Sequence, residues 1–241
     1  MEILSIIGSS RRKSTLNAVK IFENELIDAG RNTFDYIFLN DFKLEFCRGC
    51  GLCVENENKC PINDDWMAIY ERILKSDLVV FATPVYENHI SALMKNFFDR
   101  FHFLGFRPLN KSINAIIIAT CSFSGLRNTL KYMEWVIRSF GFKLIFKTGI
   151  QSYLINENKY IEILKEKIRN IEFGCKNPGL TDLLIFNDQK DRILKIRGKY
   201  HSVYQYWMHN GWLEKEYYHD IKINPVISLL ARILKKSYNR N

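Results

Sequence analysis

The feature of this sequence best suited to chemistry is a cluster of four cysteines, Cys47, Cys50, Cys53 and Cys60. Their CxxCxxC spacing places three thiolates on one tight loop, and a fourth close behind can complete a four-sulfur cage around a soft metal centre. An iron–sulfur cluster, a structural zinc ion and metal-free thiols all remain open. Disulfides are the least favoured alternative, because nothing else in the chain marks it as secreted and cytosolic thiols stay reduced.

Short apolar runs alternate with amphipathic stretches as far as residue 150. The spacing predicts buried strands at residues 3–7, 33–38, 77–82, 113–119 and 142–148, and helices at 14–29, 64–75, 90–101 and 126–140. Repeated βα units with right-handed crossovers give a doubly wound parallel sheet, whose ligand crevice lies outside the carboxyl ends of the strands. We therefore expect function in the strand-to-helix loops.

The first of these loops is rich in hydroxyl and cationic side chains. It reads GSSRRKST from Gly8 to Thr15 and directly precedes a helix. Hydroxyls, arginines and the amides of a helix start can surround a phosphate dianion. The loop lacks the second glycine of both the GxGxxG and the Walker A motifs, which argues against dinucleotides and nucleoside triphosphates. An ordinary helix cap at Ser14 or Thr15 is the alternative.

Two further loops suit a planar ligand. Residues 83–88 (TPVYEN) follow the third strand, where Pro84 fixes the chain direction and Tyr86 offers a flat ring. Residues 120–125 (TCSFSG) bring small polar groups to the same rim. One loop for a phosphate and two for a polar ring system together predict a mononucleotide with a tricyclic ring.

These segments resemble a known family. GSSRRKST resembles the FMN-phosphate loop of the flavodoxin-like NAD(P)H-dependent FMN reductases, and TPVYENHISALMKNFFDR resembles their flavin-ring loop and following helix. The cysteine segment, with Asn63, Asp64 and Asp65 after it, is similar to the cluster motif of the iron–sulfur flavoproteins in that group. The resemblance covers about residues 1–172. Ser10 stands where a proline is usual, and the third loop has fewer glycines than expected.

The resemblance implies a flavodoxin-like sheet of five parallel strands in the order 2-1-3-4-5, interrupted by a cysteine-rich loop. It implies that Ser9, Arg11, Ser14 and Thr15 hold the FMN phosphate. The flavin ring is expected against Pro84, Val85, Tyr86, Glu87, Asn88, Thr120, Cys121, Ser122 and Gly125. A [4Fe–4S] cluster is implied on Cys47, Cys50, Cys53 and Cys60, whereas Cys121 and Cys175 lie too far away in sequence to join it.

Electron transfer between these two cofactors needs no acid or base, so we expect no catalytic side chain. Electrons would come from NAD(P)H or a ferredoxin-like donor and pass to a small-molecule acceptor. A cluster-free NAD(P)H-dependent FMN or quinone-type reductase is one alternative. A non-enzymatic electron carrier or flavin-bound regulatory module is the alternative from another class, and turnover with a small acceptor would separate them.

Length, composition and charge indicate where the protein is found and which partners it has. With 241 residues and 47% hydrophobic content, the chain can bury a full core. It begins directly with a strand pattern and contains no apolar run that spans a bilayer, so we expect a cytoplasmic protein without an integral membrane segment. The net charge of +9 is concentrated in residues 151–241. We read this excess as a solvated face, and expect no nucleic acid partner.

The C-terminal part differs in composition from the rest. We predict an FMN-binding domain over residues 1–174, with its cysteine loop at 42–63, and an aromatic-rich, basic and mainly helical extension over 175–241. The aromatic residues could cover the flavin, but a hydrophobic anchor onto the sheet domain is favoured. Residues 225–238 are predicted to form an amphipathic helix that docks on this chain or a neighbouring one, with an anionic membrane surface as the alternative. We expect a homo-oligomer.

Overall fold

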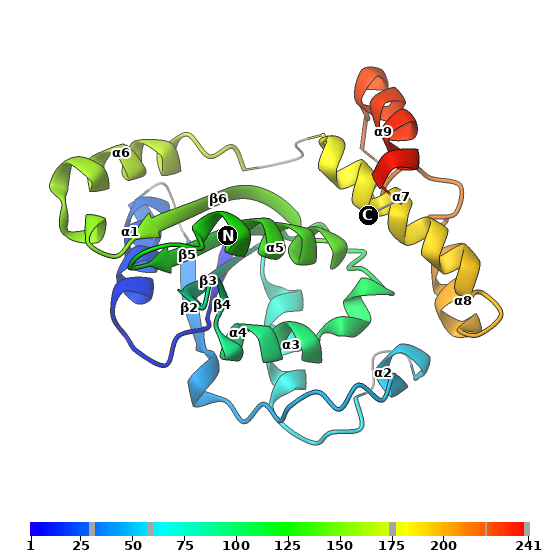
Figure 1. The fold of residues 1–241 in the computed structure, drawn as a ribbon, viewed down its shortest axis with the longest axis horizontal. Coiled ribbons are helices and arrows are strands. Elements are labelled where there is room, and N and C mark those ends of the chain that lie inside the picture. The colour runs from blue at the N-terminus through cyan, green and yellow to red at the C-terminus, as the bar shows by residue number, and fades with distance from the viewer. Residues whose placement is uncertain (29–31, 57–59, 174–176, 220, 239–241) are drawn as a thin grey trace.

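The fold is built on a parallel sheet, shown in a computed structural model that describes residues 1–28, 32–56, 60–173, 177–219 and 221–238 (Figure 1). Its five parallel strands run in the order β2-β1-β3-β5-β6, which is the predicted 2-1-3-4-5 order when they are numbered alone. The strands are β1 (Glu2–Ile7), β2 (Thr33–Phe38), β3 (Leu78–Tyr86), β5 (Asn114–Cys121) and β6 (Lys143–Gln151). A short β4 (His89–Ile90) pairs antiparallel with β3. The flavodoxin-like prediction is confirmed.

Apolar side chains cover both faces of the central strands, as a parallel sheet requires. In β1, Ile3 and Ile7 belong to one core, whereas Leu4 and Ile6 belong to the other. Helices on each face complete these two cores (Figure 1). One face carries α1 (Ser14–Asp28) and α6 (Asn158–Arg169); the other carries α3 (Trp66–Lys75), α4 (Ala92–Arg100) and α5 (Leu126–Ser139).

Three strands are longer at their carboxyl ends than the sequence predicted. The prediction of a loop directly after residue 82 was wrong, because Val85 and Tyr86 pair with Ile90 and His89 of β4 and so extend β3. β5 continues to Cys121 and β6 to Gln151, and these two residues are register partners. Residues 83–86 and 120–121 of the predicted loops therefore lie on ordered strand ends, which meet at one edge of the sheet.

Two helices begin two residues later than predicted, and each delay has a local cause. α4 begins at Ala92 because the Ser91 hydroxyl caps it and accepts the Met94 amide at 3.2 Å. α3 begins at Trp66 because the Asp64 carboxylate accepts that residue's amide at 3.3 Å from outside the helix. The predicted end of the first helix, Ala29, lies outside the described residues.

Short helices occupy several connections: η1 (Leu39–Asp41), α2 (Leu52–Glu55), η2 (His102–Gly105) and η3 (Leu154–Asn156). Of these, α2 lies inside the cysteine segment. The C-terminal helices α7 (Leu180–Ile196), α8 (His201–His209) and α9 (Pro225–Tyr238) pack beside one end of the sheet domain (Figure 1). The predicted domain boundary at residues 174 and 175, and Cys175 itself, lie outside the described residues.

The C-terminal helices are anchored to the segment that follows α4. The Trp207 indole donates to the Phe106 carbonyl at 2.7 Å, and the Tyr206 hydroxyl donates to the Pro108 carbonyl at 2.9 Å. Trp207 and Trp212 are buried against Phe186 and Tyr218. None of the described helices is long and apolar enough to cross a bilayer.

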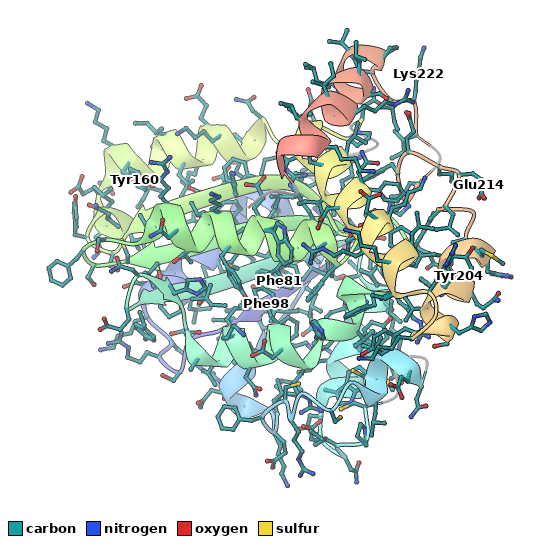
Figure 2. All side chains as sticks on the ribbon, turned by 45° about the vertical axis from the view of Figure 1, so that its right-hand side comes forward. Phe81, Phe98, Tyr160, Tyr204, Glu214 and Lys222 are labelled. Carbon is teal, nitrogen blue, oxygen red and sulfur yellow. The ribbon has the colours of Figure 1, made fainter. Side chains whose placement is uncertain are left out.

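The last helix turns much of its apolar surface to solvent. α9 spans the predicted residues and packs on α7 with Ala231 buried. Val226, Leu229, Leu230 and Ile233 are between 42% and 65% exposed. Figure 2 shows this helix at the edge of the molecule, after the labelled Lys222. An exposed apolar face of this kind is typical of an interaction surface.

Candidate functional site: a nucleotide pocket and a cysteine cavity

The first loop is held against the ends of neighbouring strands by hydroxyl groups. The Ser9 hydroxyl accepts the Arg11 amide at 3.2 Å, which folds the loop into a tight turn before α1. The buried hydroxyls of Thr15 and Thr120 lie 2.8 Å apart and join the start of α1 to the end of β5. The first helical turn and the third loop therefore face one space.

The second and third loops pack directly on each other. Glu87 and Asn88 have positive φ angles of 46° and 60°, which fit the tight turn between β3 and β4. Gly125, with φ of 94°, approaches this turn so closely that an added Cβ would lie 2.7 Å from Asn88 Cα. The Ser124 hydroxyl also donates to the Asn88 amide oxygen at 2.9 Å. Glycine at position 125 thus allows the two loops to form one wall.

Two adjoining hollows lie between the three loops, with volumes of about 150 and 380 Å³. Both are lined by Val85, Tyr86, Cys121 and Ser122. The smaller hollow is also lined by Ser9, Arg11, Lys13, Ser14, Thr15, Pro84, Thr120 and Ser152, and the larger by Glu87, Asn88, Phe123 and Ser124. The structure therefore places every residue predicted to contact FMN on these hollows, except Gly125, which supports the wall.

The chemistry of the smaller hollow suits a phosphate. It combines hydroxyl donors, two cationic side chains and the amino end of α1, whose dipole favours an anion. The guanidinium of Arg11 lies 3.4 Å from the Tyr86 hydroxyl, at the junction with the larger hollow. Arg12, by contrast, points away, because it pairs with Asp41 at 2.7 Å and stacks over Phe38.

The larger hollow suits a flat polar ring system. Tyr86 and the 90%-exposed Phe123 provide aromatic surfaces, and Asn88, Ser122 and Ser124 provide polar groups. Burial raises the pKa of the Cys121 thiol, which keeps it neutral at physiological pH. The residues of the two hollows thus fit a mononucleotide with a ring system such as FMN.

Sequence reasoning missed Lys13 and Ser152, and it did not single out Phe123 and Ser124, which also line these hollows. Lys13 lies inside the predicted phosphate loop, and its charge was sufficient signal. Phe123 and Ser124 lie inside the predicted third loop. Ser152 was missed because the last strand was predicted to end at residue 148; it follows β6 directly, and its amide donates to the Cys121 carbonyl at 2.7 Å.

The four clustered cysteines line a separate cavity of about 220 Å³. Cys47 and Cys50 are exposed, while Cys53 and Cys60 are half-buried. The loop that carries them turns at Gly49 and Gly51, whose φ angles of 64° and 74° favour glycine. The two hollows together form the nucleotide pocket. Tyr200 of the C-terminal region lines the cysteine cavity, whereas no residue of 177–219 or 221–238 lines the nucleotide pocket.

The cysteine thiols are close enough to influence one another. Burial raises the pKa of Cys53, and the neighbouring Cys60, Cys47 and Cys50 raise it further because thiolates repel. A bound metal centre would remove this repulsion and displace the protons. Within the described residues, no three Cys, His, Asp or Glu side chains are grouped tightly enough to hold a metal ion. Four cysteine sulfurs are donors that suit a cluster of soft metal ions. In the structure they share a cavity, but they do not form a coordination site.

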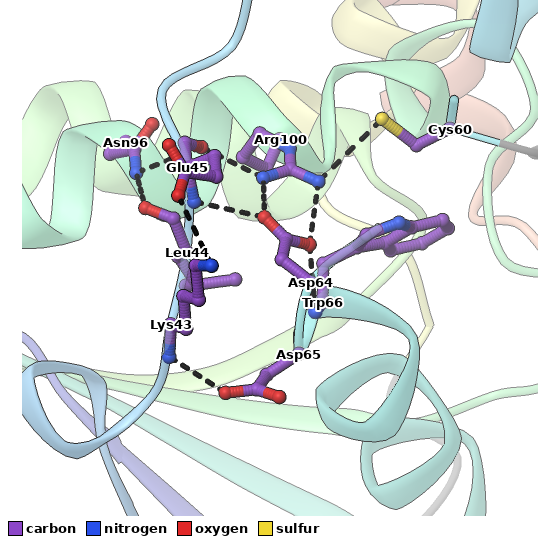
Figure 3. A network of polar contacts seen from close by, with 9 residues as sticks. All are labelled: Lys43, Leu44, Glu45, Cys60, Asp64, Asp65, Trp66, Asn96 and Arg100. Carbon is purple, nitrogen blue, oxygen red and sulfur yellow. Dashed lines mark hydrogen bonds and ion pairs between the residues drawn. The ribbon is translucent and has the colours of Figure 1, made fainter. Parts of the chain in front are cut away.

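A buried ion pair braces the cysteine segment (Figure 3). The carboxylate of Asp64 pairs with the guanidinium of Arg100, and both side chains are almost completely buried. Arg100 also donates to the Glu45 carbonyl at 2.8 Å and lies 3.6 Å from the Cys60 sulfur. Burial alone would raise the pKa of Asp64, but hydrogen bonds from Arg100 and from the amides of Glu45 and Trp66 lower it. The pair thus ties both ends of the segment to α4.

Helix α4 links the two sites. At its start, the Ser91 hydroxyl donates to the Gly8 carbonyl of the first loop, and Thr83 accepts the Ser91 amide at 3.2 Å. At its end, Arg100 contacts Cys60. Nine residues at a rise of about 1.5 Å separate these ends by roughly 13 Å. The nucleotide pocket and the cysteine cavity therefore lie at opposite ends of one short helix.

The chain is related in sequence to known proteins. Residues 1–148 match the family model described as NADPH-dependent FMN reductase. An iron–sulfur flavoprotein of Archaeoglobus fulgidus is 29% identical over 128 residues, which make up 53% of this chain and 61% of that protein. An iron–sulfur flavoprotein of Methanocaldococcus jannaschii is 33% identical over 137 residues, or 56% of this chain and 70% of that protein.

A solved structure shares the fold. The NAD(P)H:quinone oxidoreductase from Methanothermobacter marburgensis superposes with a TM-score of 0.56 at 20% identity, and the match covers 74% of this chain and 99% of that one. The family match includes all three loops of the nucleotide pocket, because residues 1–148 contain them. The chain therefore belongs to the NADPH-dependent FMN reductase family, and within it to the iron–sulfur flavoproteins.

Proposed function

We propose that this protein is an FMN-dependent oxidoreductase that couples FMN to a [4Fe–4S] cluster. The observation that carries the proposal is the convergence of four cysteines on one cavity, at the far end of the helix that begins at the nucleotide pocket. When bound, FMN exchanges one or two electrons and a [4Fe–4S] cluster exchanges one at a time.

At the nucleotide pocket, the protein is proposed to bind and orient FMN. Arg11, Lys13 and the hydroxyls of Ser9, Ser14 and Thr15 are proposed to hold the phosphate. Pro84, Val85, Tyr86, Glu87, Asn88, Thr120, Cys121 and Ser122 are proposed to surround the ring, with Gly125 shaping the wall. No side chain is assigned as an acid or base, because electron exchange between FMN and a cluster requires neither.

At the cysteine cavity, Cys47, Cys50, Cys53 and Cys60 are proposed to ligate the cluster. Four thiolates are the usual ligand set of such a cluster. Arg100 supports this assignment, since a cation near Cys60 stabilises a thiolate and a ligand's hydrogen-bond partners orient it. Tyr200, from outside the family match at residues 1–148, is proposed to limit the access of water to this cavity.

We propose NAD(P)H as the electron donor, in keeping with the family description, or a ferredoxin-like protein in its place. The acceptor is proposed to be a small molecule that reaches the larger hollow beside Phe123. A cluster-free FMN or quinone-type reductase is the main competing function, and a flavin-bound carrier without turnover is the other.

The experiment uses the full chain purified anaerobically. Its visible spectrum, its iron and sulfide contents, and the identity of the flavin released by heat should show FMN together with four irons per chain, the content of one [4Fe–4S] cluster. Full FMN without iron after reconstitution would identify a cluster-free reductase. Recovery of FAD, or of no flavin, would overturn the proposal for the nucleotide pocket. Absence of NAD(P)H-dependent and ferredoxin-dependent turnover would favour the carrier.

We also propose that the chain forms a homo-oligomer through α9. Val226, Leu229, Leu230 and Ile233 recur at three- and four-residue spacing on the exposed side, which is the spacing of paired helices. Among the described side chains beside them, the basic Arg232 pairs with Glu216 and the basic Lys235 pairs with Asp191, so both charges are already neutralised. This pairing favours a second copy over an anionic membrane as the partner.

A further inference from the structure

A third cavity lies where α7 meets the sheet domain. It has a volume of about 170 Å³ and is formed by η2, the end of α5 and the middle of α7. It shares no lining residue with the nucleotide pocket. Because α7 lies beyond residues 1–148, one wall of this cavity comes from outside the family match.

The walls of the cavity are mainly aromatic and apolar. Phe106, Trp135, Phe140 and Ile193 line it. An apolar cavity of ~150 Å³ is large enough to bind benzene. A cavity slightly larger than this, with three aromatic walls, can therefore take a planar ligand of one or two fused rings.

Buried hydrogen bonds hold the cavity walls in place. Gln189 is 6% exposed, and its amide nitrogen donates to the Gly105 carbonyl at 2.9 Å and to the Ser139 carbonyl at 2.8 Å. Its amide oxygen accepts the Tyr218 hydroxyl. One side chain thus fixes η2, α5 and α7 relative to one another, so the cavity is formed before a ligand arrives.

The polar groups at the cavity favour an uncharged ligand with a hydrogen-bond acceptor. Asp188 pairs with Arg192 at 2.8 Å, which leaves no net charge to attract an ion. The remaining N–H groups of Arg192 and the ring of His102 can donate to a carbonyl oxygen. A carboxylate ligand would meet the Asp188 carboxylate and is disfavoured.

We propose that this cavity binds an uncharged aromatic carbonyl compound of one or two fused rings. The site lies beside the cysteine cavity, because His102 and Phe106 line both. Their rings are in edge contact, with centroids 5.2 Å apart. A ligand here therefore contacts the same two side chains that form one wall of the cysteine cavity. Ligand binding itself requires neither bound FMN nor a bound cluster.

The test uses the full chain labelled with 5-fluorotryptophan and titrated with chromone, an uncharged bicyclic aromatic ketone, without any reductant. The chain has four tryptophans, and among the described lining residues of this cavity only Trp135 is a tryptophan. We expect a saturable shift of the Trp135 fluorine signal, assigned with Trp135→Phe, and little change at Trp66, Trp207 and Trp212. No saturable shift at Trp135, or equal shifts at all four signals, would overturn the proposal.

A pair of glycine variants locates the ligand. Gly105 lines the cavity, and nothing lies within 4 Å of a Cβ built on it, so Gly105→Leu adds bulk at this wall without a clash at its Cβ. Gly198 is equally open around its Cβ but lines none of the described cavities, so Gly198→Leu is the matched control.

Gly105→Leu should weaken chromone binding by about tenfold or more, and Gly198→Leu should leave it unchanged. Unchanged affinity in a folded Gly105→Leu protein would contradict the assignment. If that variant does not fold, the titration of the wild-type protein decides the question alone. Because the readout involves no turnover, it stays independent of the proposed oxidoreductase activity.

Discussion

The carboxylate of Asp64 and the guanidinium of Arg100 form an ion pair in which the side chains are 0% and 1% exposed. From this pair Arg100 reaches the Cys60 sulfur, and Asp64 accepts the Glu45 amide at 2.9 Å. The pair therefore fixes the positions at which the cysteine segment leaves and rejoins the sheet domain. A charge buried this completely depends on its partner for compensation.

Asp64→Asn should destabilise the protein by about 3–5 kcal/mol, because it leaves Arg100 buried without a counterion. Urea unfolding measures this change, and the iron content of the reconstituted variant should fall with it. Asp41→Asn is the control, since the Arg12–Asp41 pair is 61% and 47% exposed and is worth less than about 1 kcal/mol. An equal loss in the free energy of unfolding in both variants would show that burial of the Asp64–Arg100 pair has no special role.

Arg11→Ala should weaken FMN binding by about 10- to 100-fold, because a charge-assisted hydrogen bond to phosphate contributes roughly 1.5–3 kcal/mol. Titration of the apoprotein with FMN, followed by flavin fluorescence, gives the affinity. Arg12→Ala is the matched control: it removes the same charge from the next residue, whose side chain pairs with Asp41 instead. If both variants lose affinity equally, the effect is one of net charge and Arg11 has no specific role.

Replacing Cys47, Cys50, Cys53 or Cys60 by Ala should lower the iron and sulfide contents and leave FMN largely bound, because the flavin loops are separate from the cysteine cavity. Cys121→Ala and Cys175→Ala are the controls, and both should keep their iron. Iron analysis of six anaerobic preparations provides the measurement. A loss of iron in Cys121→Ala, or full iron in Cys60→Ala, would contradict the ligand assignment.

Glu134 of α5 forms ion pairs with Arg138 of the same helix and with Lys147 of β6, and the pH dependence of stability tests their contribution. Burial would raise its pKa, but the hydrogen bond from Lys147 and the charge of Arg138 lower it below the ordinary value of 4.5. A carboxyl whose pKa is lower in the folded state stabilises the protein above its unfolded pKa, and this contribution is lost as the pH falls through the folded value.

Glu134→Gln should therefore lower the free energy of unfolding at pH 7, and the difference from wild type should shrink towards pH 3. Urea titrations at a series of pH values measure it. Glu162→Gln is the control, because the Glu162 side chain is 65% exposed, and its effect should stay near zero at every pH. A difference at Glu134 that is constant with pH would indicate a packing effect rather than an ionic one.

Leu229→Glu combined with Ile233→Glu should dissociate the proposed oligomer, because it places charges on the exposed face of α9. Sedimentation velocity over a range of concentrations gives the mass. Ile163→Glu on α6 is the control, since Ile163 is an exposed apolar residue on a helix far from α9 (Figure 1). A wild-type protein that remains monomeric would contradict the proposal outright.

Local sequence spacing was sufficient to predict most of the sheet domain. Apolar runs such as residues 113–119 identify buried strands because both faces of a parallel sheet must be apolar. The hydroxyl-rich first loop and the cysteine spacing identify their sites because the residues of each site are neighbours in the chain. Parallel topology then brings the strand ends to one edge, which is why Ser9, Tyr86 and Cys121 meet at one pocket.

Tertiary structure decided what depends on contacts between distant residues. Asp64 and Arg100 are 36 residues apart, and no local pattern indicates that they pair. β3 extends to Tyr86 only because β4 returns to pair with it.

The aromatic C-terminal region packs beside the cysteine cavity rather than the nucleotide pocket. Helix α9 buries Ala231 instead of its leucines. Amphipathic spacing shows that a helix has an apolar side, but the shape and polarity of the neighbouring surface determine which side is buried.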